Sequence, residues 1–317
     1  MGLRRFIVRR LLLVVPIMIG VSLITFGLTK LAPSGPIEFA VGFNPNVGPE
    51  DVARLREQYG LNQPVWQQYI DWIARAIQGD FGQQIGTNRE VSSILARRIP
   101  PTIALGLFGW AIALIVAIPT GVYAAVNKDS LGDNVSRFIA LSGISTPNFW
   151  LGLMLILVFA VKLDVWSVIA PRKPLWHPEM LWYLILPGIT LGTAASASLM
   201  RIMRSSMTEE INKEYVTAAR AKGLPERTVI LKHVLRNSLI SVATVAAFLT
   251  ANILAGAVVV ETVFNWPGMG RQLVQAVIQR QINVIMAITL FVGLAEVVMN
   301  LFADIAYAAL DPRISYD

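Results

Sequence analysis

Long apolar runs with almost no charged residue are the feature that most constrains this chain. Six of them stand out, at about residues 9–30, 101–125, 137–161, 181–203, 238–260 and 283–308. About 20 helical residues cross the roughly 30 Å hydrocarbon core of a bilayer. The composition agrees, because only 15% of the residues are charged, against roughly a quarter in soluble domains. The sequence therefore predicts an all-α integral membrane protein with six transmembrane helices.

The charges outside these runs predict the orientation of the chain. The first run follows Arg4, Arg5, Arg9 and Arg10, is longer than the core of a secretory signal and lacks a convincing cleavage site. Cytoplasmic segments of membrane proteins are enriched in Lys and Arg, so we expect an uncleaved first helix and a cytoplasmic amino terminus. Six spans then place the carboxyl terminus and the connections 126–136 and 204–237 in the cytoplasm. The net charge of +7 fits this bias and implies no nucleic-acid partner.

Three parts are expected along the chain: a cytoplasmic tail with the first helix (1–30), a helical extracytoplasmic insertion (31–100), and a five-helix core (101–317) containing the loop 204–237. Within the insertion, 49–59 predicts a short polar helix, and the glycines at 79, 82 and 86 indicate turns. The segment between them places several apolar side chains at helical spacing on one face: Trp66, Tyr69, Ile70, Ile73 and Ile77. This face either packs on the outer ends of the spans or docks an extracytoplasmic partner.

Polar and small residues inside the spans leave two interpretations open. Prolines at 16, 119, 147 and 187 interrupt the runs and free helix carbonyls that need a protein or water partner. The stretches "SGISTPNFW" and "TLGTAASASLM" either allow close helix packing or line a partly hydrated pathway. The candidate pathway residues are Ser145, Pro147, Asn148, Ser196, Asn252 and Glu261. In the last span, Glu296, Asn300 and Asp304 share a helix face and indicate either interhelical hydrogen bonds or a proton relay.

Several kinds of chemistry are absent from the sequence. The chain has no cysteine, and no glycine is followed by lysine, so it lacks a phosphate-binding GxxxxGK[ST] loop. It has no HExxH or GxSxG motif, and its two histidines lie in different loops. We therefore expect no catalytic residue and no metal site in this chain.

The loop 204–237 is charged and rich in helix formers, unlike the spans around it. Residues 208–222 predict a helix, Gly223 suits a left-handed stop, and Pro225 suits the first turn of a second helix at about 225–236. Val229, Ile230, His233 and Val234 would share one side of that second helix, and the small Ala218–Ala219 pair would let a partner surface come close. Such a rigid helix pair either lies on anionic lipid or fits a protein socket, which the interleaved acidic residues favour.

The stretch "EYVTAARAKGLPERTVILKHVLRNSL" strongly resembles the cytoplasmic loop of ABC-importer permeases of the dipeptide/oligopeptide/nickel class. Thr217, Ala218 and Ala219 precede Gly223 at the spacing of the Glu-Ala-Ala importer motif, with Thr217 in place of its Glu, as is usual in the peptide class. The segments "GDFG", "TPNFWLGL", "RSSM", "VVVETVFNWPGMGRQLVQA" and "ALDPRI" also look like this family, so the resemblance covers nearly the whole chain.

This resemblance implies an inner-membrane permease subunit of an ATP-driven importer that takes peptides from an extracytoplasmic binding protein. The implied partners are a second six-span permease, usually a different chain, and two cytoplasmic ATPases that bind ATP and Mg, so this chain itself needs no cofactor. The residues implied to couple to an ATPase are Tyr215, Thr217, Ala218, Ala219, Arg220, Lys222, Gly223 and Pro225. Trp266, Pro267, Gly268 and Gly270 are implied to shape an external loop. The alternatives are an importer of nickel or another small solute and, from another class, an ion-coupled carrier using Glu296 and Asp304.

Overall fold

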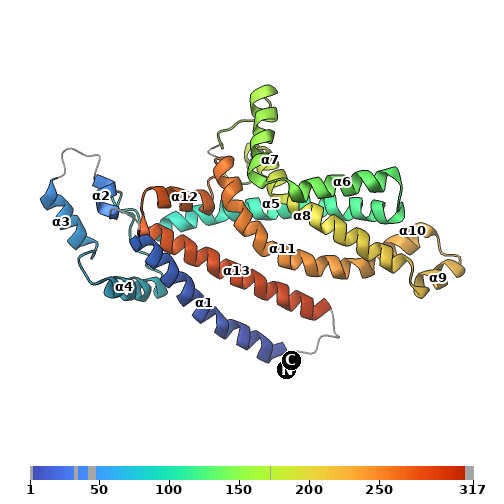
Figure 1. The fold of residues 1–317 in the computed structure, drawn as a ribbon, viewed down its shortest axis with the longest axis horizontal. Coiled ribbons are helices and arrows are strands. Elements are labelled where there is room, and N and C mark those ends of the chain that lie inside the picture. The colour runs from blue at the N-terminus through green and yellow to red at the C-terminus, as the bar shows by residue number, and fades with distance from the viewer. Residues whose placement is uncertain (1–2, 32–34, 42–47, 172, 311–317) are drawn as a thin grey trace. The chain divides into compact units, whose positions relative to one another are not determined.

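Helices make up most of the part of the protein that the structure describes. The computed structural model describes residues 3–31, 35–41, 48–171 and 173–310, and every named element in these ranges is a helix (Figure 1). Two compact units are formed, the first by residues 1–102 and 267–297 and the second by residues 103–266 and 298–317. Two of their three boundaries fall inside long helices, α5 (Val91–Val126) and α13 (Ile282–Leu310), and the third lies between residues 266 and 267. The expected all-α class is confirmed.

Five helices of the described chain are long and apolar enough to cross a membrane, or six if one bent pair counts as a single span. They are α1 (Leu3–Leu31), α5, α8 (Pro178–Ile211), α11 (Leu235–Val263, reached without a break from Glu226) and α13. The bent pair joins α6 (Leu131–Ser145) to α7 (Asn148–Leu155), which continues into the π-helical segment η1 (Ile156–Lys162).

The third predicted span, 137–161, is not one straight helix. The helix axis bends by 105° between its two halves, at Thr146 and Pro147. Thr146 has φ −83° and ψ 122°, which is the extended conformation that a following proline imposes on its predecessor. The sequence indicated an interruption at Pro147, and the structure makes that interruption a sharp corner.

The insertion after α1 contains three short helices in the first unit: α2 (Pro36–Val41), α3 (Pro49–Gln58) and α4 (Val65–Ile77). Gly79 and Gly86 lie in turns, as predicted, with φ values of 83° and 84°, whereas Gly82, with a φ of 77°, lies outside a turn. The insertion is tied to the start of α13, because the backbone of Ile85 exchanges two hydrogen bonds with the side chain of Gln281, at 2.9 and 3.1 Å.

The apolar face predicted for α4 is only partly the packed one. Tyr69 and Ile73 do pack, but around Trp72, which is buried together with Phe26 of α1 and Met286 of α13. The other three members of the predicted face are exposed, at 65% for Trp66, 54% for Ile70 and 82% for Ile77. The packed face is therefore rotated by about a quarter turn of the helix from the predicted one.

A short helix, α12 (Met269–Ile278), packs on the start of α5 within the first unit. The Thr102 hydroxyl accepts a 2.8 Å hydrogen bond from the Met269 amide, and Arg98 donates to Gln272 at 3.1 Å and to the Pro267 carbonyl at 3.2 Å. Gly268 is the residue that precedes α12.

In the second unit α8 lies beside α6, α7 and α11 (Figure 1). Arg204 of α8 donates two hydrogen bonds of 2.6 Å to the Asp133 carboxylate of α6, which is fully buried. Toward the other end of α8, Tyr183 stacks between Trp166 and Trp266, with ring centroids 4.5 and 6.0 Å away. An ion pair and an aromatic stack therefore fix α8 near its two ends.

Candidate functional site

The corner segment, residues 212–228, connects α8 to the helical run that continues as α11. The predicted helix 208–222 is broken inside this region, because α8 ends at Ile211 and the next helix, α9, spans Glu214–Ala221. Lys213 is extended, with φ −77° and ψ 150°. The Asn212 side chain folds back and donates to the Thr208 carbonyl at 2.8 Å, which satisfies a carbonyl at the helix end. The break frees α9 to turn its own apolar side toward the core.

One side of α9 is anchored in the core of the second unit. Val216 is fully buried and Ala219 is 9% exposed, and both join a cluster that contains Met203 and Met207 of α8. Buried apolar side chains of this kind hold a short helix that would be marginal alone. The position of α9 is therefore set by the packing of the spans beneath it.

Gly223 makes the turn after α9. Its φ of +76° lies in the left-handed region that suits glycine, and no atom stands within 4 Å of where its Cβ would be. Its amide donates to the Arg220 carbonyl at 2.9 Å. Across the turn Arg220 donates to the Glu226 carboxylate through two nitrogens, at 2.6 and 3.1 Å, which is the two-bond geometry that fixes orientation best. The predicted stop at Gly223 is confirmed.

The second helix expected at 225–236 is not a separate helix. Pro225 precedes the first helical residue, α10 spans Glu226–Thr228, and the π-helical segment η2 (Val229–Val234) leads directly into α11. No glycine or proline lies between Glu226 and Val263 to end the run apart from Gly256, deep in the predicted fifth span. Val229, Ile230 and Val234 are buried, as their shared side predicted, whereas His233 is half-buried.

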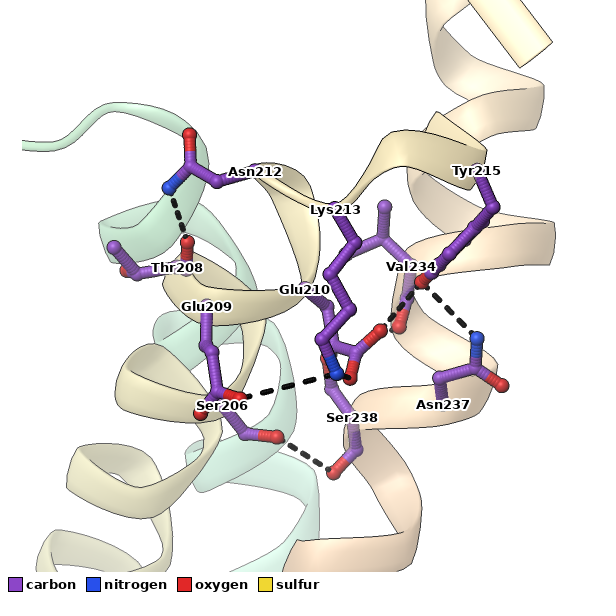
Figure 2. A network of polar contacts seen from close by, with 10 residues as sticks. All are labelled: Ser206, Thr208, Glu209, Glu210, Asn212, Lys213, Tyr215, Val234, Asn237 and Ser238. Carbon is purple, nitrogen blue, oxygen red and sulfur yellow. Dashed lines mark hydrogen bonds and ion pairs between the residues drawn. The ribbon is translucent and has the colours of Figure 1, made fainter. Parts of the chain in front are cut away.

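A polar network ties the end of α8 and the start of α9 to the start of α11 (Figure 2). The Tyr215 hydroxyl donates to Glu210 at 2.6 Å and accepts from the Asn237 amide at 3.0 Å. Lys213 also donates to Glu210. Its hydrogen bond to that carboxylate raises the pKa of Lys213, and burial followed by the Glu210 contact raises the pKa of Tyr215. Both groups thus keep their protons at neutral pH and remain donors.

The outer surface of the corner segment consists of small, basic and turn residues. Six of the predicted coupling residues are exposed: Thr217, Ala218, Arg220, Lys222, Gly223 and Pro225. Tyr215 is half-buried in the network, and Ala219 faces the core of its own chain. The surface open to a partner therefore passes through Ala218 and leaves out Ala219.

The sequence did not single out three features of this site. Val216 is the fully buried anchor of α9, and an apolar residue three positions before Ala219 was a usable sequence signal. Glu210 and Asn237 hold Tyr215, but their partners lie across a helix break that the sequence pattern hid. The Asp133–Arg204 pair joins the connections 126–136 and 204–237; one acidic and one basic residue at the ends of two spans could have indicated it.

The candidate pathway residues occupy different environments. Ser145 and Pro147 are exposed at the 105° bend. The side-chain nitrogen of Asn148 (Nδ2) lies 3.6 Å from where a Cβ on Gly256 of α11 would be. Ser196 is 9% exposed and donates to the Thr193 carbonyl of its own helix at 2.8 Å. Glu261 is fully buried in the last turn of α11. Asn252 also belongs to α11, but its side chain lies outside the described residues.

Most of the small-residue run on α8 packs against other helices. A Cβ on Gly192 would lie 2.5 Å from the Gly109 carbonyl oxygen of α5, so the two backbones touch there. Such close approach is what small residues allow in membrane helices. In the last helix, Glu296 is exposed and Asp304 is half-buried.

Comparisons with known proteins give a consistent result. Residues 117–316 match the family described as "Binding-protein-dependent transport system inner membrane component", and residues 3–106 match the family of its N-terminal part. The oligopeptide transport system permease protein AppB of Bacillus subtilis (strain 168) is 39% identical, over 98% of this chain and 99% of that protein. The dipeptide transport system permease protein DppB of Alkalihalophilus pseudofirmus is 36% identical, with 98% and 99% covered. The glutathione transport system permease protein GsiC of Escherichia coli (strain K12) is 38% identical, with the same coverage.

A solved structure shares the fold. The crystal structure of an amino acid ABC transporter with histidines aligns with a TM-score of 0.51 at 14% identity, over 69% of this chain and 94% of that chain. The two family matches together cover most of the chain. The alignments with the three permease proteins each cover 98% of this chain. The chain therefore belongs to the family of inner-membrane components of binding-protein-dependent transport systems.

Proposed function

We propose that this chain is the membrane-spanning permease subunit of an ATP-driven ABC importer that translocates peptides. The observation that carries the proposal is the corner segment: an exposed surface whose helix α9 is anchored in the same core as α8 and α11. A push on an exposed segment held in this way moves two spans together, because a close-packed interior transmits strain. The full-length peptide permeases among the relatives support a peptide as the substrate.

The same proposal assigns the partners and their sides of the membrane. The corner segment faces the cytoplasm and docks on one of two ATPase subunits, which bind ATP and Mg and carry out the hydrolysis. The insertion, residues 31–100, lies on the opposite side, where a solute-binding protein delivers the substrate. The substrate crosses between this chain and a second permease subunit. Both termini are cytoplasmic, in line with the arginines before α1.

Transport by sealed vesicles containing the whole assembly tests the proposal. Uptake of a labelled di- or oligopeptide presented with the binding protein should stop when ATP is withdrawn and should continue after an uncoupler collapses the proton gradient. The opposite pattern would replace the importer with an ion-coupled carrier. ATP-dependent uptake of nickel with no uptake of peptide would support the ATP-driven importer but would contradict a peptide as its substrate.

A further inference from the structure

The helix α4 presents three different faces around its circumference. Tyr69, Trp72, Ile73 and Ala76 pack on α1 and α13 within the first unit. The exposed Trp66, Ile70 and Ile77 lie on an adjacent strip. The remaining strip is polar and borders a cavity of about 1020 Å³; its members are Gln68, Asp71, Arg75 and Gln78. Exposed apolar and polar strips that flank a packed face are the arrangement expected of a helix lying along a membrane surface beside protein.

The contacts of α4 fix its depth relative to the first span. The apolar part of α1 runs from Leu11 to Thr29, between Arg10 and Lys30. The Tyr69 hydroxyl hydrogen-bonds to the Ser22 hydroxyl at 2.7 Å, and Ser22 lies eight residues before Lys30, or about 12 Å along the helix. Lys30 in turn donates to Gln68 at 2.5 Å. The Tyr69 side chain of α4 thus reaches below the boundary between headgroups and hydrocarbon at the carboxyl end of α1.

The span that α4 packs on also carries exposed apolar side chains. Near the same end of α1, Ile24 and Leu28 are 66% and 63% exposed, as expected of lipid-facing residues. A tryptophan on the strip suits the interface between hydrocarbon and headgroups, where its ring and its N–H group are both accommodated. We propose that α4 is an interfacial anchor whose Trp66, Ile70 and Ile77 side chains insert into the lipid leaflet at the carboxyl end of α1.

The absence of cysteine from the sequence makes this placement directly measurable. Ile70→Cys and Ile77→Cys carry a nitroxide on the apolar strip, and Asp71→Cys and Gln78→Cys carry it on the polar strip as matched controls. Each labelled chain is reconstituted with its partner subunits in phosphatidylethanolamine–phosphatidylglycerol vesicles. Collision rates are then measured with oxygen, which concentrates in lipid, and with a water-soluble nickel chelate. The assembly containing the unsubstituted chain gives the background from partner cysteines.

The proposal expects a high ratio of oxygen to nickel collisions at 70 and 77, and a lower ratio at 71 and 78. Frequent nickel collisions at 70 and 77 would place the strip in water and overturn it. Low rates with both reagents would show that a protein partner covers the strip, which also overturns it. The readout needs neither substrate nor ATP, so it stands or fails separately from the transport function.

Discussion

Among single residues, Gly223 has the clearest dependence on backbone conformation. Its positive φ, with open space around the Cβ position, means that a substitution acts through strain and not through a clash. Proline cannot adopt this φ and also removes the amide that donates to Arg220. Gly223→Pro should therefore abolish ATP-driven uptake, while Gly223→Asn should stay within about twofold of the unsubstituted protein, because Asn tolerates the left-handed region.

Uptake and membrane abundance measured side by side for the two Gly223 variants check this expectation. Equal uptake in both variants at equal abundance would mean that the turn conformation does not matter for coupling.

The neighbouring alanines 218 and 219 should respond to enlargement in different ways. Ala219→Leu forces extra volume into a buried site and should lower the free energy of unfolding by about 1–3 kcal/mol. Ala218→Leu is exposed, so it should leave stability unchanged and weaken association with the ATPase instead. Denaturation in detergent together with copurification of the ATPase separates the two effects. The prediction fails if Ala218→Leu is the less stable variant or if only Ala219→Leu loses the ATPase.

At the level of elements, the Asp133–Arg204 pair holds α6 against α8. The Asp133 carboxylate is fully buried and takes both hydrogen bonds from Arg204. Removing one partner leaves an uncompensated buried charge, which costs about 3–5 kcal/mol. Arg204→Ala should therefore be strongly destabilised in chemical denaturation, and a double replacement of both residues by alanine should be less so. Arg201→Ala, which is exposed on the same helix, is the control; a loss as large as that of Arg204→Ala would contradict this account.

The sequence predicts those features of the elements that depend on local residues, and it misses those that depend on contacts between distant parts of the chain. Hydropathy is summed along a window, so it located the apolar runs but could not show the 105° corner at Pro147. Helical spacing collected the apolar residues of α4, yet only the packed structure shows that Trp72 is buried and Trp66 exposed. Gly223 was predicted because a positive φ is a local property. The environments of Ala219 and Tyr215 depend on contacts made across the break between the helices α8 and α9, which no local sequence pattern records.

On the scale of the whole molecule, the rigid corner segment and the interfacial strip of α4 place different demands on the chain. The corner segment needs an exposed surface fixed to a buried core, and it has the Arg220–Glu226 pair and the Tyr215 network in addition to apolar packing. The apolar strip of α4 must instead stay uncovered by protein so that it can contact lipid. If the proposed orientation holds, these two features serve opposite faces of the membrane, so the orientation itself is the property to measure.

Single cysteines in the cysteine-free chain report that orientation. Lys222→Cys lies on the exposed corner segment, and Arg54→Cys replaces a side chain of α3 that is 75% exposed. The proposed orientation places the amino terminus in the cytoplasm, so a membrane-impermeant maleimide should label Arg54→Cys in intact cells and Lys222→Cys only in inverted vesicles. A permeant maleimide, which should label both variants in both preparations, controls for reactivity. Labelling of both positions from the same side would require an even number of crossings between α3 and α9, and would remove the corner segment from the face where an ATPase acts.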